Sequence, residues 1–270
     1  MLNYEPVARF AFFFGVLAVM VIWEMLAPRR HLATSKRIRW YSNLGLVVID
    51  TVALRLLIPV QAVGVALFVG KHGWGILNNV MLPRWVVIVF AVLSLDLAIY
   101  LQHAMFHTLP AFWRLHRVHH TDLDFDVTTG VRFHPIEILL SMGIKMAAVM
   151  FLGASAIAVV IFEIILNATS MFNHGNVRLP RPIDRVLRLF VVTPEMHRVH
   201  HSVIIQEYNS NFGFNFPWWD RILGTYRDQP AKGHEGMTIG LAQFRDSKTL
   251  TLPWLLVLPF LRRPANYFTR

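Results

Sequence analysis

The sequence predicts an all-α integral membrane protein with about four transmembrane helices and a histidine-rich helical cap on the cytosolic side. Three observations predict this fold. Hydrophobic residues make up 55% of the chain, which is high for a soluble protein. They gather in runs of about 20 residues, the length that an α-helix needs to cross a bilayer. Histidines stand three and four residues apart in three clusters, and this spacing places side chains on one face of a helix.

The composition restricts the kind of site that the chain can build. It has no cysteine, which excludes disulfides, zinc ribbons, iron–sulfur clusters and thiolate-bound haem, so any metal must bind nitrogen and oxygen ligands. The formal net charge is +10. In a membrane protein this charge favours a basic cytoplasmic surface against anionic lipid. Since no nucleic-acid-binding motif is visible, we expect no nucleic acid partner.

The first predicted span covers residues 7–26. Its apolar part is too long for a signal peptide and no small-residue cleavage site follows it, so we expect an uncleaved helix. The loop that follows carries five basic residues over 29–39. The positive-inside rule therefore places this loop in the cytoplasm and the start of the first helix on the opposite side.

The second predicted span, residues 43–69, contains two charged residues, Asp50 and Arg55. Charges at this depth are costly and usually face the interior of a helix bundle. Their five-residue spacing favours separate partners over a direct pair. Pro59 is expected to kink this helix, because proline removes a backbone donor and clashes with the preceding turn. The connection over 70–84 then lies outside.

The third predicted span, residues 85–107, changes character along its length. It begins with apolar residues and ends with Asp96, Tyr100, His103 and His107, which recur at intervals of three and four. A polar stripe therefore emerges at the cytoplasmic end of this helix. Pro110 ends the helix, and another helix is expected over 112–120.

An apolar helical hairpin is predicted over residues 136–173. Gly153, between Leu152 and Ala154, marks its turn. The hairpin crosses out and returns, so that His134 and His174 lie on the same cytoplasmic side as the clusters. An interfacial amphipathic helix is expected over 182–192.

Another helix is expected to carry the third histidine cluster. Thr193, Pro194 and Glu195 have the residue types of a helix N-terminus. Threonine caps the helix, proline fits its first position, and glutamate favours its positive end. These residues therefore predict where the helix with the third cluster begins.

The three clusters contain eight of the 13 histidines. One cluster is H-x-x-x-H at 103–107, and the other two are H-R-V-H-H runs at 116–120 and 197–201. Imidazole suits iron, zinc, copper and nickel, and such groups on one membrane face are improbable by chance. With one imidazole at each coordination position, the histidines would fill two metal sites, with room left for oxygen or water. The predicted ligands are His103, His107, His116, His119, His120, His197, His200 and His201, with His174 as a ninth.

Several polar residues near the clusters are candidates for supporting roles. Asp96 can accept a hydrogen bond from a ligand imidazole and so fix the tautomer of that ring. A structural pair with Arg55 is an equally favoured interpretation of Asp96. Asn209 and Asn211 follow the third cluster. A role in orienting its imidazoles and a purely structural role are equally favoured for these two residues. For His134, the interpretation as a metal ligand and the interpretation as a residue that contacts the ligands are equally favoured.

Other polar residues are expected to play ordinary structural parts. Three alternating carboxylates after the second cluster can tune ligands, but a solvated loop is the favoured reading; they are Asp122, Asp124 and Asp126. Three isolated histidines are expected to be plain surface or core residues; they are His31, His72 and His234.

This set of motifs resembles the membrane-bound fatty acid hydroxylase and sterol desaturase superfamily. The resemblance runs from Asp96 to Tyr226. It rests on D-x3-Y-x2-H-x3-H at 96–107, H-x2-H-H at 116–120, F-H-P at 133–135, F-N-H with Asn173 at 172–174, and H-x2-H-H at 197–201. It implies a non-haem di-iron oxygenase in a four-helix transmembrane bundle with a cytosolic histidine cap.

The sequence departs from the superfamily pattern at one position. Members with a third H-x-x-x-H box carry a histidine four residues before the position of His174, where this chain has Ser170. The resemblance therefore implies that water or another residue completes one metal site. The alkylglycerol monooxygenase branch is similar in this respect, so ether lipids are among the substrates that the resemblance implies.

From the resemblance we expect hydroxylation, or desaturation, of a lipid or sterol-like substrate in a multi-pass membrane protein. The implied cofactors are two Fe ions, with O2 as cosubstrate; Zn can occupy the isolated protein because it competes well for nitrogen ligands. No electron-carrier domain is recognisable, so an external electron-transfer protein is expected. It would dock on the basic inner surface; lipid headgroups are the favoured alternative there. The arginines concerned are Arg178, Arg181, Arg185 and Arg188.

The expected domain organisation follows from the spans and the motifs. Residues 1–84 would form N-terminal transmembrane helices with their connecting loops, and 85–230 the fatty acid hydroxylase-like di-metal catalytic domain. Residues 231–270 would form a C-terminal interfacial segment. The metal site is expected on the cytoplasmic face, which in a bacterium would be that of the inner membrane.

The alternative reading is a membrane zinc-dependent lipid hydrolase. Such an enzyme needs fewer ligands and a nearby glutamate base, and Glu195 is the candidate close to a cluster. A bis-histidine cytochrome would place its histidines deep in two spans, and a metal transporter would need polar residues through the bilayer. Neither pattern is seen in these mostly apolar spans.

Overall fold

The computed structural model describes residues 5–261, and the described part is helical, with two isolated β-bridges but no strand. The helices and 3-10 turns are α1 (Glu5–Leu26), α2 (Lys36–Leu57), α3 (Ala62–His72), η2 (Ile76–Asn79), α4 (Arg84–Thr108), α5 (Pro110–His120), η3 (Val127–Val131), α6 (Pro135–Leu152), α7 (Ala156–Asn173), α8 (Arg181–Leu187), α9 (Pro194–His200), α10 (Ile205–Tyr208), α11 (Trp218–Ile222), α12 (Gly233–Gly236), η4 (Ser247–Leu250), α13 (Leu252–Val257) and η5 (Leu258–Phe260).

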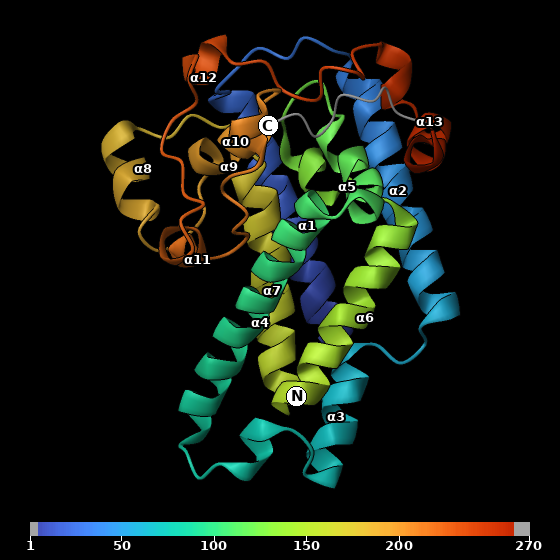
Figure 1. Cartoon of the computed structure of the whole chain (residues 1–270), viewed down its shortest axis with the longest axis vertical. Helices are drawn as coiled ribbons and strands as arrows, with labels where there is room; N and C mark the ends of the chain where they lie inside the picture. Colours follow the sequence, from blue (N-terminus) through green and yellow to red (C-terminus); the bar gives the residue numbers. More distant parts are fainter. Residues whose placement is uncertain (1–4, 262–270) are drawn as a thin grey trace.

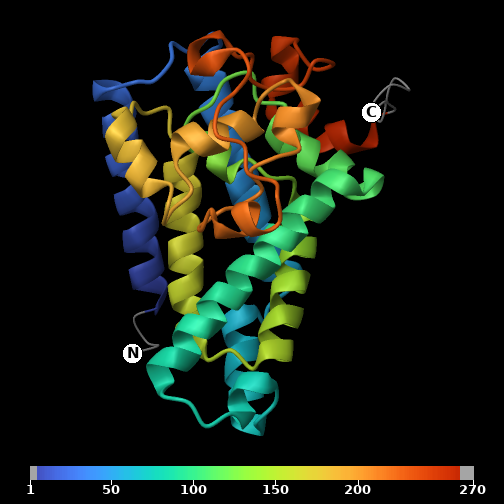
Figure 2. The ribbon, with the colours of Figure 1, turned by 60° about the vertical axis from the view of Figure 1, so that its left-hand side comes forward.

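The long helices form a bundle, and the short helices form a cap at one of its ends. Figure 1 shows α4, α6 and α7 running along the long axis, with α9, α10 and α12 gathered at the top and α3 at the bottom. The same division is clear after a 60° turn in Figure 2. The predicted all-α bundle with a helical cap is confirmed.

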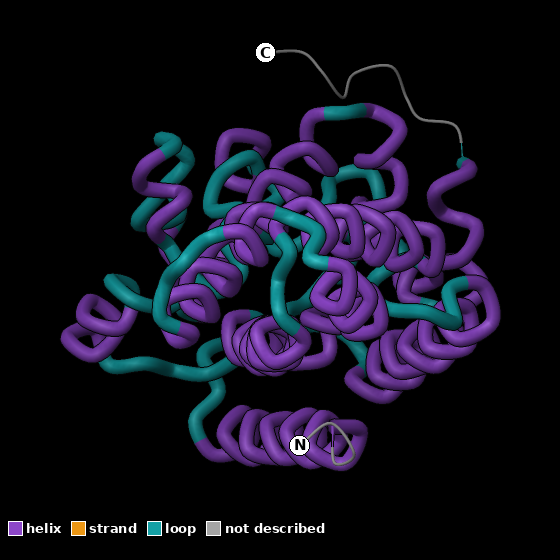
Figure 3. Tube along the Cα trace, turned by 90° about the horizontal axis from the view of Figure 1, so that it is seen from below, coloured by secondary structure: helices purple, strands orange, loops and turns teal. Residues whose placement is uncertain are grey.

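Five segments are long and apolar enough to cross a membrane: Pro6–Leu26, Lys36–Asn79, Arg84–Thr108, Pro135–Leu152 and Ala156–Asn173. The sequence predicts about four, and the count differs because the hairpin over 136–173 consists of two full-length helices. The first segment is peripheral, with 6% of its most apolar stretch buried against 39% for α7. Figure 3, seen from below, shows α1 at the edge of the bundle.

The second span is broken rather than kinked. Helix α2 ends at Leu57, and α3 begins at Ala62. Ile58, which precedes Pro59, has φ −130° and ψ 72°, as expected because the proline ring disfavours the helical conformation in the residue before it. The predicted kink is therefore a complete interruption of the helix.

The predicted turn between α6 and α7 is confirmed at Gly153, which has φ 71°. A Cβ atom placed on Gly75 would lie 2.2 Å from the backbone nitrogen of Gly153. No side chain fits at Gly75, so the loop after α3 packs closely against this turn. That contact ties together the helices at the end of the bundle opposite the cap.

The helices that carry the histidine clusters lie close to their predicted positions, but α5 begins at Pro110 and not at 112. Pro110 is at the first turn of α5 directly after α4, and the hydroxyl of Thr193 accepts a hydrogen bond from the Met196 amide at the start of α9. Helix α8 ends at Leu187, earlier than the expected amphipathic helix over 182–192.

Candidate metal centre

Nine histidines from four helices meet where the bundle joins the cap. Two of these histidines lie in the last two turns of α4, and three lie on α5. One is the C-cap residue of α7, and the other three lie on α9 and at the residue directly after it. All nine are at most 6% exposed. They are the nine predicted ligands: His103, His107, His116, His119, His120, His174, His197, His200 and His201.

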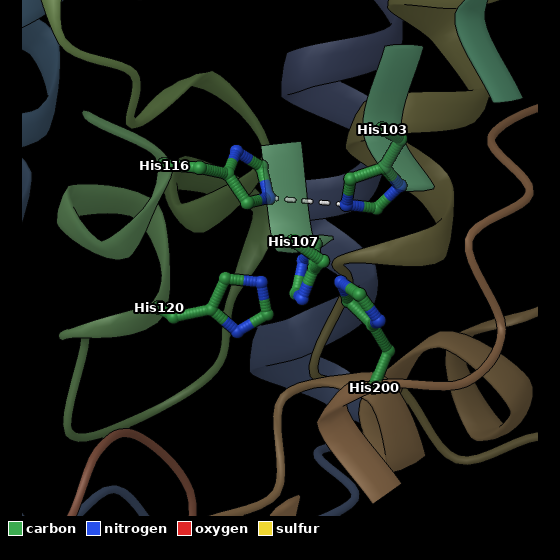
Figure 4. A group of neighbouring side chains, drawn as sticks. All are labelled: His103, His107, His116, His120 and His200. Carbon is green, nitrogen blue, oxygen red and sulfur yellow. Dashed lines mark hydrogen bonds between the residues drawn. The ribbon is translucent and has the colours of Figure 1, made fainter. Parts of the chain in front are cut away.

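The nine histidines fall into two groups whose potential ligand atoms lie within 4.8 Å of one another. The five-histidine group is His103, His107, His116, His120 and His200, and the four-histidine group is His119, His174, His197 and His201. The histidines of the five-histidine group come from α4, α5 and α9, and Figure 4 shows their rings pointing toward one another. The groups are adjacent, since the rings of His120 and His201 stack with centroids 4.6 Å apart.

Hydrogen bonds to the Nδ1 atoms fix the tautomer of several rings. The Nδ1 of His103 donates to the Phe212 carbonyl at 2.7 Å, that of His200 to the Ser210 carbonyl at 2.7 Å, and that of His174 to the Ser170 carbonyl at 2.7 Å. A carbonyl only accepts, so each Nδ1 carries the proton and each Nε2 keeps a free lone pair. This is the arrangement of a histidine that binds a metal.

A carboxylate orients one further ring. The Nδ1 of His116 donates to Oε1 of Glu137 at 2.6 Å, and Glu137 is 2% exposed. Longer contacts of 3.3 Å join His107 Nδ1 to the Asn209 side chain and His119 Nδ1 to the Arg132 carbonyl. Glu137 was not predicted; its only sequence signal is its place one turn into the helix that follows the F-H-P motif.

The nitrogen donors fit metal ions. Nε2 atoms of His103 and His116 lie 3.0 Å apart, and that of His174 lies 3.1 Å from those of His119 and His197. Two nitrogens about 2.1 Å from one ion, at right angles, are about 3 Å apart. The Nε2 atoms of His107, His120 and His200 are buried without a hydrogen-bond partner.

The charge state of the rings suits metal binding as well. Burial lowers the pKa of His116 and of His174 to about 3. It lowers the pKa of His119, His200 and their neighbours in the cap well below the ordinary range. The rings are therefore neutral near pH 7, which is the form that binds a metal.

The other predicted residues lie around the two groups but mostly contact the fold. Asp96 accepts from Trp219 Nε1 at 2.7 Å, so it pairs neither with an imidazole nor with Arg55, and both readings of it were wrong. The Tyr100 hydroxyl lies 2.7 Å from Thr225 Oγ1. Asn173 donates to the Phe214 carbonyl at 2.9 Å.

The remaining two candidates are also structural. The Asn211 side chain donates to the carbonyls of Met196 and Arg227, both at 2.9 Å, and does not orient an imidazole. His134 Nδ1 accepts from the Ile136 amide, and its Nε2 donates to the Leu256 carbonyl at 3.2 Å. His134 therefore caps α6 and lies outside both groups.

The carboxylates after the second cluster are buried, not solvated as predicted. Arg39 on α2 bonds Asp122 at 2.6 and 2.9 Å and Asp126 at 2.5 Å, with all three side chains at most 1% exposed. Burial alone would raise the pKa of Asp122, but Arg39 and Arg132 outweigh it and hold the pKa at about 2. This ion-pair network fixes the loop after α5 against α2.

A second buried network joins His234 and Glu195. His234 is 7% exposed, and its Nε2 lies 2.9 Å from Glu195 Oε2. Glu195 also pairs with Arg29 and Arg198. Burial raises its pKa, but His234 and Arg198 outweigh this and lower it to about 2. Glu195 is therefore a poor base for a hydrolase, and His234 is a buried residue outside both histidine groups, in agreement with the expectation for it.

The chain matches the family model described as fatty acid hydroxylase over residues 88–225, just over half of its length. It is 29% identical over 144 residues to ornithine lipid hydroxylase OlsE of Rhizobium tropici, covering 53% of this chain and 42% of that protein. It is 26% identical over 163 residues to human alkylglycerol monooxygenase, covering 58% and 34% of the two chains. It is 27% identical over 143 residues to human cholesterol 25-hydroxylase, covering 52% and 51%.

These alignments cover about a third to a half of the relatives' own length. No solved structure matches the chain. The five apolar segments and the family together make the chain an integral membrane protein. Because the family model covers just over half of its length, this chain belongs to the fatty acid hydroxylase family.

Proposed function

We propose that this chain is a di-iron oxygenase that hydroxylates a membrane lipid. The reaction would consume one lipid C–H bond, O2, two electrons and two protons, and yield an alcohol and water. One observation carries the proposal: two buried, all-imidazole groups lie at the capped end of the helix bundle, next to a cavity lined by its helices. Hydroxylation is favoured over desaturation by the names of the relatives.

The five-histidine group would hold one iron ion and the four-histidine group the other. Such ions, when bound, supply the oxidising power from O2 that an aliphatic C–H bond requires. The four-histidine group is one ligand short at Ser170, whose hydroxyl donates to the Gly130 carbonyl at 2.8 Å. Water or another ligand would complete that site.

The protein would bring the lipid to the metals within the bundle. His103 and His116 line a cavity of about 300 Å³ together with apolar side chains such as Ile99, Phe106 and Phe214. A second cavity of about 740 Å³ shares part of this wall and is lined by α1, α2 and α7. Apolar walls hold a lipid chain and keep bulk water from the site.

The cap would face the cytoplasm. The guanidinium of Arg30, in the basic loop after α1, donates to the carbonyls of His234 and Met237, the latter at 2.8 Å. The basic loop and the cap therefore lie on the same side, and the positive-inside rule assigns that side to the cytoplasm.

An acidic electron-transfer protein would dock on this face. A groove of about 880 Å³ is lined by Arg29, Arg178, Arg181 and Arg185 and reaches Glu195, two residues before His197. Arg188, which was expected on this surface, is 4% exposed and pairs with Asp184 and Asp228. Arg29 is likewise paired, with Glu195 and Glu235. Docking is therefore left to the exposed Arg178, Arg181 and Arg185.

The test is oxygen incorporation by the full chain in membranes. Membranes that contain the iron-loaded protein, a reductant and isotopically labelled O2 should yield a lipid that gains one labelled oxygen atom. His119→Ala and His200→Ala remove one ligand from each group and should abolish this gain. His72→Ala is the matched control, because His72 is exposed at the opposite end of the bundle. Ester cleavage without O2, or full activity in both cluster variants, would refute the proposal.

A further inference from the structure

The cavity next to the metal centre is not purely apolar. Three polar side chains from three different helices line it: Asp50 on α2, Gln102 on α4 and Glu137 on α6. Each is at least nine-tenths buried, with exposed fractions of 7%, 9% and 2%. A wall built only to hold a hydrocarbon chain would not place three such groups at this depth, where polar side chains are costly.

All three side chains offer an acceptor oxygen without a partner. These atoms are Oδ1 of Asp50, Oε1 of Gln102 and Oε2 of Glu137, none of which has a hydrogen-bond partner among the described residues. The amide group of Gln102 donates to Ser141 Oγ at 2.6 Å, and the other Glu137 oxygen accepts from His116. Each of the three side chains therefore keeps an oxygen that can accept a hydrogen bond.

The one lysine that lines the cavity does not meet these acceptors. Lys145 Nζ pairs with Glu163 Oε1 at 2.7 Å, and the other Glu163 oxygen pairs with Arg9 at 2.6 Å. Buried acceptors are nearly always matched by donors. A molecule that enters the cavity can supply such donors.

The adjoining cavity offers the route for such a molecule. The two cavities share wall residues Phe13, Val47 and Thr51. The larger one reaches Phe10 and Phe14, which are 56% and 59% exposed on the apolar surface of α1. A lipid can therefore keep its tail in the larger cavity while its polar group reaches the acceptors in the smaller one.

We propose that the substrate is a lipid with a hydrogen-bond-donating group, a hydroxyl or a primary ammonium, which binds Asp50, Gln102 and Glu137. This inference rests on the proposed function. At about 30 Å³ for each water-sized group, the cavity of about 300 Å³ holds roughly ten non-hydrogen atoms. His103 and His116 border the same space. The carbon that is oxidised therefore lies within about ten non-hydrogen atoms of the donating group.

The experiment compares two pairs of lipids whose members differ by methylation of the hydrogen-bond donors. Hexadecylglycerol is paired with its di-O-methyl ether, and a phosphatidylethanolamine with the phosphatidylcholine of the same acyl chains. Binding to the metal-free full chain is measured by thermal stabilisation, and oxidation by the iron-loaded full chain is measured separately. We expect the donor-bearing member of at least one pair to bind and react about tenfold better or more, since sites built for a hydrogen bond reject analogues that lack it.

Variants connect this preference to the three side chains. Asp50→Leu and Gln102→Leu should reduce the preference about tenfold, while Gln206→Leu, a matched change on the exposed surface of α10, should not. Asp50→Asn keeps an acceptor but removes the charge, so it should weaken binding of the ammonium lipid and largely spare the hydroxyl lipid. Asp50→Asn thereby identifies which donor the site takes.

The outcomes separate this inference from the proposed function. If wild type binds and oxidises the donor-free lipids as well as the donor-bearing ones, the acceptors are merely hydrated and the inference fails while the oxygenase stands. If donor-bearing lipids bind through Asp50 but no O2-dependent product forms, the inference holds and the proposed function fails. The wild-type comparison needs no variant, so a misfolded Asp50→Leu protein does not remove the test.

Discussion

Replacing Glu137 should weaken iron binding in a graded way. Glu137→Gln keeps an acceptor for His116 Nδ1 but loses the charge of the 2.6 Å bond, and charge-assisted bonds are about twice as strong as neutral ones. Loss of a partner behind a metal-binding histidine costs about 10- to 100-fold in affinity. We therefore expect the affinity for iron to fall about tenfold in Glu137→Gln and about 100-fold in Glu137→Leu. These losses correspond to about 1.4 and 2.8 kcal/mol of binding free energy.

The matched comparison is Asn209→Ala. Asn209 is exposed, and its side-chain oxygen lies 3.3 Å from His107 Nδ1. Because this contact is neutral and longer, its loss should lower the affinity for iron by less than about threefold. Iron(II) is titrated anaerobically into the purified full chain against a competing chelator, and bound iron is counted. If Glu137→Leu binds iron as tightly as wild type, or if Asn209→Ala is the more damaging change, the reasoning about ligand orientation is wrong.

Four further predictions concern topology, packing, pH and a buried ion pair. The chain has no cysteine, so a single cysteine can be placed at the exposed Lys71 or at the exposed Lys232. An impermeant maleimide should label a cysteine at position 71 from outside the membrane and one at position 232 from the cytoplasmic side. Labelling of both from the same side would contradict the topology. Gly130→Ala would place a Cβ 2.6 Å from the Ser170 carbonyl oxygen and 3.1 Å from His174 Nδ1, so metal analysis should show about one iron lost per chain. The pKa of Asp122 is about 2 in the fold against a model-peptide value of about 3.9. Because this pKa is depressed, the group's contribution of about 2–3 kcal/mol to stability is present above pH ~4 and is lost as the pH falls toward 2. Melting curves of the metal-free chain should show this loss, and Arg39→Met, which leaves buried carboxylates unpaired, should cost about 3–5 kcal/mol at neutral pH.

The sequence predicts the bundle and the histidines because both depend on local patterns. Apolar runs identify the spans, and Gly153 and Pro110 mark where helices end. Spacings of three and four residues place imidazoles on one face of α4, α5 and α9. Each of these signals lies within a few residues of the feature that it predicts.

The partners of these residues were not predictable because they are distant in the chain or belong to the backbone. Asp96 meets Trp219, 123 residues later, and Arg39 meets Asp122, 83 residues later. The carbonyls that orient His103 and His200 have no sequence signature at all. An acidic loop looks solvated when its buried arginine is not known, which explains the error over the carboxylates after the second cluster.

The two H-R-V-H-H runs divide their histidines between the metal groups in opposite ways. His116 and His120, four residues apart, join the five-histidine group and His119 the four-histidine group, whereas His197 and His201 join the four-histidine group and His200 the five-histidine group. The runs therefore supply three ligands to each group. The difference in ligand number must come from the other two helices.

Helices α4 and α7 account for this asymmetry. Helix α4 adds His103 and His107, four residues apart, to the five-histidine group, while α7 adds only His174 to the other, with Ser170 four residues before it. Ser170 and Gly130 both line the small cavity, and a histidine at position 170 would add a ring beside the close contact between Gly130 and the Ser170 carbonyl. Under the proposed function, serine at this position would leave the four-histidine group one ligand short and would also leave room in the cavity wall, so ligand number and substrate space would be coupled there.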